Sequence, residues 1–192
     1  VIAMLYPASS KYIPESTFVS ITRDLAEKVE VPVGLHYDHS NSFKGIMTGI
    51  KNGFTSVMID GSSLDYEDNI ELTSEVVKTA HAMDIDVEAE LGFVGSASNE
   101  KDFQNKSFYT EPKKAREFIK KTEVDSLAVA IGSAHGNYVA TPDLDFERLQ
   151  EIKKVVNIPL VLHGGSGIPE EQIKQAVRLG INKLNIGTEF NQ

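Results

Sequence analysis

The sequence contains no cysteine, has no long apolar run and carries more acidic than basic side chains. Without cysteine there can be no disulfide-stapled secreted domain, no thiolate metal site and no cysteine nucleophile. No apolar run approaches the roughly 20 residues that a membrane-spanning helix requires, and nothing resembles a signal peptide. The formal net charge of −9 argues against a nucleic-acid partner or an anionic membrane, since either would favour a basic surface. We therefore expect a soluble, cytoplasmic protein, and a local site can still accept a phosphorylated substrate.

The composition is that of an ordinary globular domain, and the chain shows a regular alternation of two kinds of segment. Short segments rich in β-branched residues are predicted strands: 1–5, 31–37, 55–60, 86–91, 125–131, 159–163 and 183–186. Longer amphipathic segments are predicted helices: 15–29, 41–52, 67–83, 112–121, 145–154 and 170–179. Thr110 and Pro112 signal one helix start, and Gly53 and Gly180 follow two helix ends. Such alternation predicts βαβ units on a parallel sheet.

The number of predicted strands favours a closed (β/α)8 TIM barrel over an open doubly wound sheet. Such a barrel normally needs eight strands and about 250 residues, whereas this sequence has 192 residues and begins inside a strand. We therefore predict that residues 1–192 form a single barrel domain with strands two to eight, lacking the first strand and the last helix. Residues 92–109 form the longest irregular stretch, and loops of that length commonly cover a site or are disordered.

Histidines and carboxylates stand where predicted strands end, which is the edge that carries the active site of a parallel barrel. His39, His135 and His163 follow three different strands, and Asp38, Asp60 and Glu90 stand at strand ends as well. A single strand-end histidine is more often structural than a metal ligand. Three of them beside carboxylates favour a metal, because neutral imidazoles suit Zn²⁺ and catalytic zinc keeps an open position beside three protein ligands.

The other two histidines are interpreted differently. His36 lies one step inside its strand and is expected to be a buried orienting group, whereas His81 lies in a predicted helix and is expected to be a surface or packing residue.

Two glycine-rich segments complete the predicted site. Gly164-Gly-Ser-Gly precedes a predicted helix, and Asn185-Ile-Gly-Thr follows the last predicted strand. Loops after the last two strands of such barrels commonly bind phosphate, as do helix N-termini. A glycine-rich turn alone is weak evidence, but its position beside His163 favours a phosphate site.

These strand ends resemble those of a known family. The segments LHYDH, SVMIDGSS, VEAELG, DSLAVAIGSAHG, LVLHGGSG and INKLNIGTE are similar to the successive strand-end motifs of class II, metal-dependent fructose- and tagatose-bisphosphate aldolases. They occur in the family's order and cover nearly the whole chain.

The resemblance implies a role for each matching residue. His39, His135 and His163 would be ligands of a catalytic Zn²⁺, with Glu90 as an alternative ligand. Asp38 would be the acid/base that exchanges a proton with the C4 hydroxyl of the sugar. The dihydroxyacetone-phosphate part of the substrate, together with a monovalent cation (Na⁺ or K⁺), would lie near Ser10, Gly136, Gly164, Gly165, Ser166, Asn185, Ile186, Gly187 and Thr188. The family also implies a homo-oligomer, either a dimer or a tetramer.

Metal-assisted chemistry fits the aldol reaction. A Lewis acid stabilises the enediolate that remains after the C3–C4 bond breaks, and a neighbouring base removes the C4 proton. A lysine Schiff base would be the other route. Lys183 is the one lysine in a predicted inner strand, and we place it at the start of that strand, which is the end away from the site.

The loop after Glu90 departs from the family pattern. The family carries a Gly-Gly-x-Glu-Asp segment whose glutamate exchanges a proton on the dihydroxyacetone-phosphate carbon, whereas this chain has Gly95-Ser-Ala-Ser-Asn-Glu-Lys-Asp. Glu100 is the candidate replacement after a two-residue shift, and a solvated loop residue is an equally good interpretation. Two other functions stay open: a metal-dependent sugar-phosphate epimerase or isomerase, and a barrel that binds a sugar phosphate without turnover.

Overall fold

The computed structural model describes residues 1–190, and the chain divides into two compact units. Unit 1 comprises residues 1–89 and 122–124, and unit 2 comprises the remaining residues. Each unit contains parallel strands joined through helices, so the predicted parallel α/β class is confirmed. Among the described residues, no helix combines the length and the apolar character needed to cross a bilayer.

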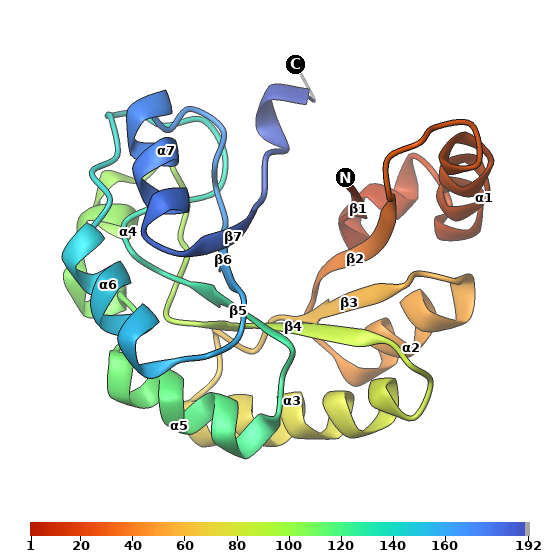
Figure 1. Cartoon of the computed structure of the whole chain (residues 1–192), viewed down its shortest axis with the longest axis horizontal. Helices are drawn as coiled ribbons and strands as arrows, with labels where there is room; N and C mark the ends of the chain where they lie inside the picture. Colours follow the sequence, from red (N-terminus) through yellow and green to blue (C-terminus); the bar gives the residue numbers. More distant parts are fainter. Residues whose placement is uncertain (191–192) are drawn as a thin grey trace. The chain divides into compact units, whose positions relative to one another are not determined.

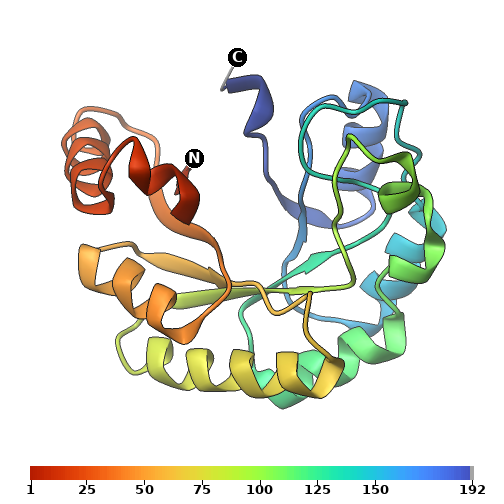
Figure 2. The same ribbon diagram turned by 180° about the vertical axis from the view of Figure 1, so that it is seen from behind.

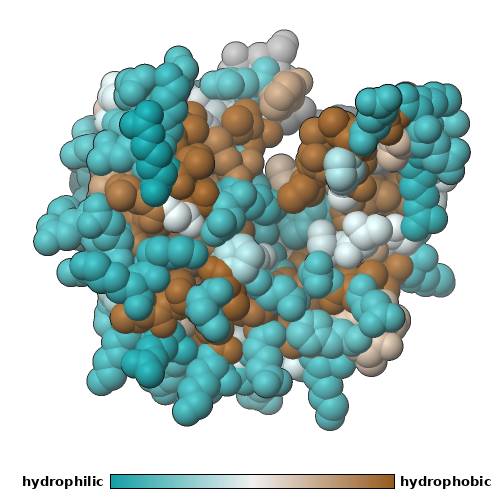
Figure 3. Space-filling view, viewed as in Figure 1, coloured by the Kyte–Doolittle hydropathy of each residue, from teal (hydrophilic) through white to brown (hydrophobic). Residues whose placement is uncertain are grey.

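In unit 1, four parallel strands follow one another in chain order. The elements are β1 (Ile2–Leu5), the 3₁₀ helix η1 (Pro7–Lys11), α1 (Glu15–Ala26), β2 (Gly34–Ser40), α2 (Phe43–Asn52), β3 (Ser56–Ile59), α3 (Tyr66–His81) and β4 (Asp86–Leu91). Helix α2 packs against β2 and β3, and α3 packs beside α2 (Figure 1). The outer side of α3 carries hydrophilic side chains along the lower edge of the space-filling view (Figure 3). Strand β4 is shared, because its last two residues belong to unit 2.

In unit 2, three parallel strands also follow chain order. The elements are α4 (Glu100–Gln104), η2 (Lys106–Phe108), α5 (Pro112–Thr122), β5 (Ser126–Val129), α6 (Phe146–Val155), β6 (Leu160–Leu162), α7 (Glu170–Arg178), β7 (Ile181–Leu184) and η3 (Thr188–Phe190). Strand β6 pairs with β5 on one side and with β7 on the other. Helix α7 packs against β7, as the view from behind also shows (Figure 2).

Local sequence explains where the helices begin and end. The Ser42 hydroxyl accepts a hydrogen bond from the backbone N–H of Gly45 at the start of α2, and Asp145 does the same for Arg148 at the start of α6. Each cap satisfies an N–H group that has no partner within the helix. Helix α2 ends at Gly53, whose φ of 96° is a conformation that glycine adopts without a steric penalty.

The inner strands are apolar on both faces. Val57, Met58 and Ile59 of β3 are fully buried. Strands β5 and β6 show the same pattern, with all of Leu127–Val129 and Leu160–Leu162 at 0% exposure. Parallel strands covered by helices on one side and by side chains on the other give such continuous apolar runs. Burial of these strands therefore supplies the rigid base from which the polar strand ends project.

Three predictions about the elements were wrong in detail. Strand β2 ends at Ser40 rather than at residue 37, so Asp38 and His39 lie inside the strand. Strand β7 begins at Ile181, so Lys183 is its third residue and not its first. The stretch 92–109 is not wholly irregular, because it contains α4 and η2.

Thr110 was expected to mark a helix start by capping it, but its hydroxyl bonds elsewhere. It donates to the carbonyl oxygen of Leu91 and accepts from the backbone N–H of Ala130. Thr110 therefore connects the ends of β4 and β5 within unit 2.

Candidate active site

The candidate ligand His39 is placed by a bulge in β2. Tyr37 pairs with Val57 and Ser40 pairs with Ile59, so β2 holds one more residue than β3 between the two pairs. His39 has a φ of 48°, which costs a residue with a side chain about 1–3 kcal/mol. Bulges next to active sites commonly redirect a side chain, and the strain at His39 indicates that the surrounding strand imposes this direction.

Asp60, at the end of β3, fixes the ring of His39. Asp60 Oδ2 lies 2.9 Å from His39 Nδ1, and Asp60 Oδ1 accepts hydrogen bonds from the hydroxyl and the backbone N–H of Ser62 at 2.6 and 3.1 Å. Burial opposes ionisation of the carboxyl, but the hydrogen bonds from His39 and Ser62 outweigh it and lower the pKa of Asp60 to about 2. A carboxylate at Nδ1 holds the proton there, so Nε2 is the His39 nitrogen suited to a metal.

Asp38 lies in a second polar group of unit 1. His36 Nε2 is 3.4 Å from Asp38 Oδ1 and 3.8 Å from Glu88 Oε2, and His36 Nδ1 is 2.7 Å from the hydroxyl of Ser56. His36 and Glu88 are each 2% exposed and Asp38 is 9% exposed. The three side chains are close enough to hold a cation themselves. Because Ser56 anchors the far side of the His36 ring, His36 is well placed to orient Asp38.

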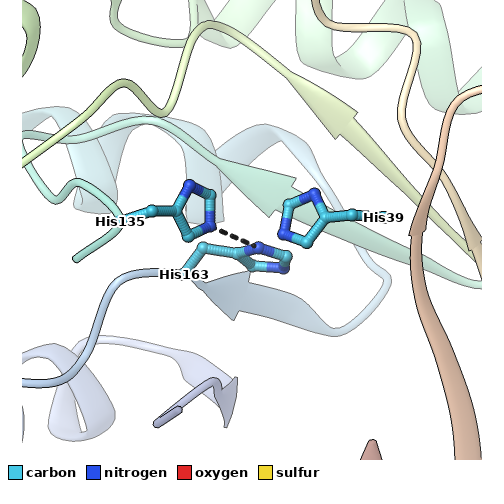
Figure 4. Close-up of side chains that lie close together, drawn as sticks. All are labelled: His39, His135 and His163. Carbon is cyan, nitrogen blue, oxygen red and sulfur yellow. Dashed lines mark hydrogen bonds between the residues drawn. The ribbon is translucent and has the colours of Figure 1, made fainter. Parts of the chain in front are cut away.

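Unit 2 brings His135, His163 and Glu90 together. His135 Nε2 lies 3.4 Å from His163 Nδ1 (Figure 4, which also draws His39), and His163 Nδ1 lies 3.9 Å from Glu90 Oε2. Two nitrogens on one tetrahedral zinc ion, each about 2.05 Å from it, would be about 3.3 Å apart. The observed nitrogen separation fits that geometry, so His135 and His163 suit a shared metal ion.

His163 is fully buried at the end of β6, and Asn185 supports its ring from the far side. The Asn185 amide nitrogen lies 3.3 Å from His163 Nε2, and Asn185 is itself 8% exposed. Asn185 therefore restrains the rotation of a ring whose other nitrogen faces His135.

The two glycine-rich segments lie against each other in unit 2. The backbone N–H of Gly165 donates to the Asn185 carbonyl oxygen at 2.9 Å, and the N–H of Gly167 donates to Glu189 Oε1 at 2.9 Å. An added Cβ at Gly165 would stand 2.9 Å from the Asn185 carbonyl oxygen, whereas one at Gly136 or Gly187 would meet no atom within 4 Å. The two segments are thus closely packed at Gly165 and open at Gly187, and the loop after β5 is likewise open at Gly136.

The remaining predicted site residues are distributed over both units. Ser10 lies in η1 of unit 1, and its hydroxyl donates to Glu15 Oε1 at 2.8 Å. Glu100 is the first residue of α4 in unit 2, is exposed, and accepts a hydrogen bond from the side chain of Gln104 at 2.6 Å. Ser166 is buried and accepts a hydrogen bond from the N–H of Glu189 at 3.3 Å. Ile186 and Thr188 lie beside Asn185 and Gly187 in the segment after β7.

Two participants could not be assigned from the sequence. Asp60 was recognised at a strand end, but its pairing with His39 depends on the bulge in β2, which the sequence does not signal. Tyr138 follows His135 in the loop before α6, and its hydroxyl bonds to backbone groups beside both His135 and His163. A tyrosine in a loop carries no signal of such contacts.

Comparison with known proteins gives consistent matches. The profile of the family described as fructose-bisphosphate aldolase class-II matches residues 1–192. The solved structure of the YdjI aldolase from Escherichia coli K12 is 41% identical with a TM-score of 0.88, and the match covers 100% of this chain and 67% of that one. The structure of fructose-bisphosphate aldolase (Fba) from Campylobacter jejuni is 25% identical with a TM-score of 0.80, and the match covers 100% of this chain and 65% of that one. The chain thus spans about two thirds of the length of these structures.

Proposed function

The chain belongs to the class II fructose-bisphosphate aldolase family, and from this premise we propose that the protein is a metal-dependent lyase acting on a ketose 1,6-bisphosphate. The reaction is the reversible cleavage of fructose or tagatose 1,6-bisphosphate to dihydroxyacetone phosphate and glyceraldehyde 3-phosphate. The observation that carries the proposal is the convergence of His135, His163 and Glu90 in a chain of this family.

The metal in this proposal is Zn²⁺, held by His39, His135 and His163, each of which offers one ring nitrogen. Glu90 is the alternative ligand, since its carboxylate approaches the same nitrogen of His163 as His135 does. When bound, the ion would act as a Lewis acid at the substrate's carbonyl and hydroxyl oxygens and stabilise the charge left by bond cleavage. Three imidazoles with an open position are the donor set of a catalytic zinc site.

Asp38 is the proposed acid/base for the C4 hydroxyl. It is almost fully buried, and His36 stands 3.4 Å from its Oδ1, anchored in turn by Ser56. A base must be held within hydrogen-bond reach of the proton that it removes, and the neighbouring His36 ring supports this role for the Asp38 carboxylate. Glu100 is the proposed second acid/base, at the carbon of dihydroxyacetone phosphate. Its exposed position in α4 would require that part of the chain to rearrange when substrate binds.

The phosphate of the dihydroxyacetone portion is proposed to bind at the glycine-rich segments. The open space over Gly136 and Gly187 supports this, because an anion can approach backbone N–H groups only where no side chain intervenes. Gly164, Gly165, Ser166, Asn185, Ile186 and Thr188 complete the proposed surroundings, with Ser10 as a further contact and Na⁺ or K⁺ as a further ion.

We also propose a fold, a cellular location and an oligomeric state for the protein. The βα order of both units supports a TIM-barrel-like fold, and we propose that residues 1–192 form strands two to eight of such a barrel as one domain. We further propose a cytoplasmic homo-oligomer, a dimer or a tetramer, in which a neighbouring subunit could supply contacts to the far phosphate. A tetramer or dimer in sedimentation experiments would support this part.

The deciding experiment measures cleavage of fructose and tagatose 1,6-bisphosphates by the purified protein. We expect triose-phosphate release that EDTA abolishes and added Zn²⁺ restores, and the preferred sugar identifies the substrate. His163→Ala is the matched inactive variant.

Two other outcomes would contradict the proposal. Interconversion of sugar phosphates without carbon–carbon cleavage would identify an epimerase or isomerase. Binding of zinc and sugar phosphate without any product would identify a non-catalytic member of the family.

A further inference from the structure

The side chain of Tyr138 spans the space between two loops of unit 2. Its hydroxyl oxygen accepts a hydrogen bond from the backbone N–H of Ala134 at 2.7 Å and donates one to the carbonyl oxygen of Gly164 at 2.9 Å. Ala134 immediately precedes His135, and Gly164 immediately follows His163. One hydroxyl therefore joins the backbone beside one proposed metal ligand to the backbone beside the other.

The two loops are also in direct contact, which makes their separation sensitive to this link. Gly164 has a φ of 67°, and a Cβ added there would collide with the carbonyl oxygen of Ala134. The Tyr138 ring has two further neighbours, Phe103 and the backbone of Gly167. It packs edge-on against Phe103 with ring centroids 5.3 Å apart, and an added Cβ at Gly167 would stand 3.2 Å from its Cδ2 atom.

The protonation of the phenol suits this double role. Burial raises the pKa of Tyr138 to about 12, although the hydrogen bond from the Ala134 N–H works in the opposite direction. The hydroxyl therefore keeps its proton at neutral pH, and a protonated hydroxyl can donate to one backbone group while it accepts from another.

We propose that Tyr138 is a positioning residue that sets the distance between His135 and His163, and thereby the affinity of the site for a divalent metal ion. The inference rests on the proposed function, because it assumes that these two histidines bind one ion. Removal of the hydroxyl leaves Ala134 N–H and Gly164 C=O without this partner, and the direct link between the two loops that supports the 3.4 Å separation of the ring nitrogens is lost. Groups that orient metal ligands from outside typically change metal affinity about 10–100-fold when they are lost.

The test compares Tyr138→Phe with Tyr109→Phe. Tyr109 is a matched control, because it is a buried tyrosine of the same unit whose hydroxyl donates to one backbone carbonyl, that of Phe103, at 3.0 Å. Zinc affinity is measured on the metal-free proteins by competition with a chromogenic chelator, without substrate. We expect Tyr138→Phe to bind zinc about 10–100-fold more weakly than the wild type and Tyr109→Phe to bind it within about twofold.

A second variant covers the case in which Tyr138→Phe does not fold. Gly167→Ala would press a methyl group against the Tyr138 ring and should also weaken zinc binding. Equal zinc affinity of Tyr138→Phe and Tyr109→Phe would overturn the inference while leaving the proposed function intact. Failure of the wild type to bind zinc would overturn both.

Discussion

Replacement of Asp60 by asparagine tests how the ring of His39 is held. The two side chains have the same shape, and the amide oxygen of the variant could still accept the hydrogen bonds from Ser62. The amide nitrogen, however, would then face His39 Nδ1, where the carboxylate oxygen now stands at 2.9 Å. An amide N–H donates to Nδ1, so the proton of the neutral ring moves to Nε2. Because Nε2 is the nitrogen proposed to bind the metal, Asp60→Asn should weaken zinc binding about 10–100-fold.

The stability change can be worked out from the pKa of Asp60. The folded protein lowers it from 3.8 to about 2, and a difference of nearly two units corresponds to about 2 kcal/mol. Because the folded-state pKa is the lower one, this stabilisation is present above about pH 4 and is lost as the pH falls toward 2. Asp60→Asn should therefore lower the free energy of unfolding by about 2 kcal/mol at pH 7 and by progressively less below pH 4.

The assay combines urea unfolding of the metal-free protein at several pH values with chelator competition for zinc. Asp145→Asn is the matched control: Asp145 caps α6, is partly buried, and has a pKa lowered by the hydrogen bonds from Arg148 and Lys106 in spite of burial. The control should lose stability and keep its zinc affinity. Wild-type zinc affinity in Asp60→Asn, or a stability loss that does not depend on pH, would refute this account of His39.

Three further predictions concern stability. Gly164→Ala should destabilise the protein by about 2–4 kcal/mol in urea unfolding, because the new Cβ meets the Ala134 carbonyl and φ is positive; Gly136→Ala, with no atom near its added Cβ, should cost less, and equal losses would contradict the contact. Leu149→Ala should lower the free energy of unfolding by about 2–5 kcal/mol in the same assay, since Leu149 is fully buried in α6. A loss below about 1 kcal/mol would show that the surrounding core collapses into the cavity left by the leucine side chain. Burial raises the pKa of Tyr138 from 10.0 to about 12, so its contribution is present below pH 10 and is lost between about pH 10 and 12. Wild-type unfolding free energy should fall by roughly 1–2 kcal/mol more than that of Tyr138→Phe over this range, after allowance for solvent screening.

The parallel α/β class could be predicted because apolar segments and amphipathic segments alternate, and each type of segment has its own period. Strand β4 was predicted with its observed bounds, since Val87, Ala89 and Leu91 alternate with acidic residues and Gly92 follows the last of them. Strand β7 was placed two residues late, because Asn182 and Lys183 interrupt its apolar character. Asn182 instead uses its side-chain oxygen to accept from the N–H of Leu160 at 3.1 Å. Polar residues whose side chains bond to a neighbouring strand are hard to recognise from local sequence.

Candidate ligands could be found from strand-end position, but their supporting contacts could not. His135, His163 and Glu90 lie close together in unit 2, as expected for residues at the ends of neighbouring parallel strands, and their role as metal ligands stays a prediction. Asp60 supports His39 through a side-chain contact between segments that are distant in the sequence. Tyr138 acts instead through hydrogen bonds to backbone groups. Neither kind of contact leaves a sequence pattern.

The bulge in β2 limits how this site can evolve or be redesigned. Side chains of a strand alternate between its two faces, and one extra residue moves every later side chain of the strand to the opposite face. A deletion at Asp38, His39 or Ser40 would therefore do more than remove a side chain, since it would also restore regular pairing with β3. Substitution at position 39 does not change which face of the strand any side chain occupies. Changes in metal preference are thus accessible through point substitutions, whereas insertions and deletions in this strand should be rejected even when every polar residue is retained.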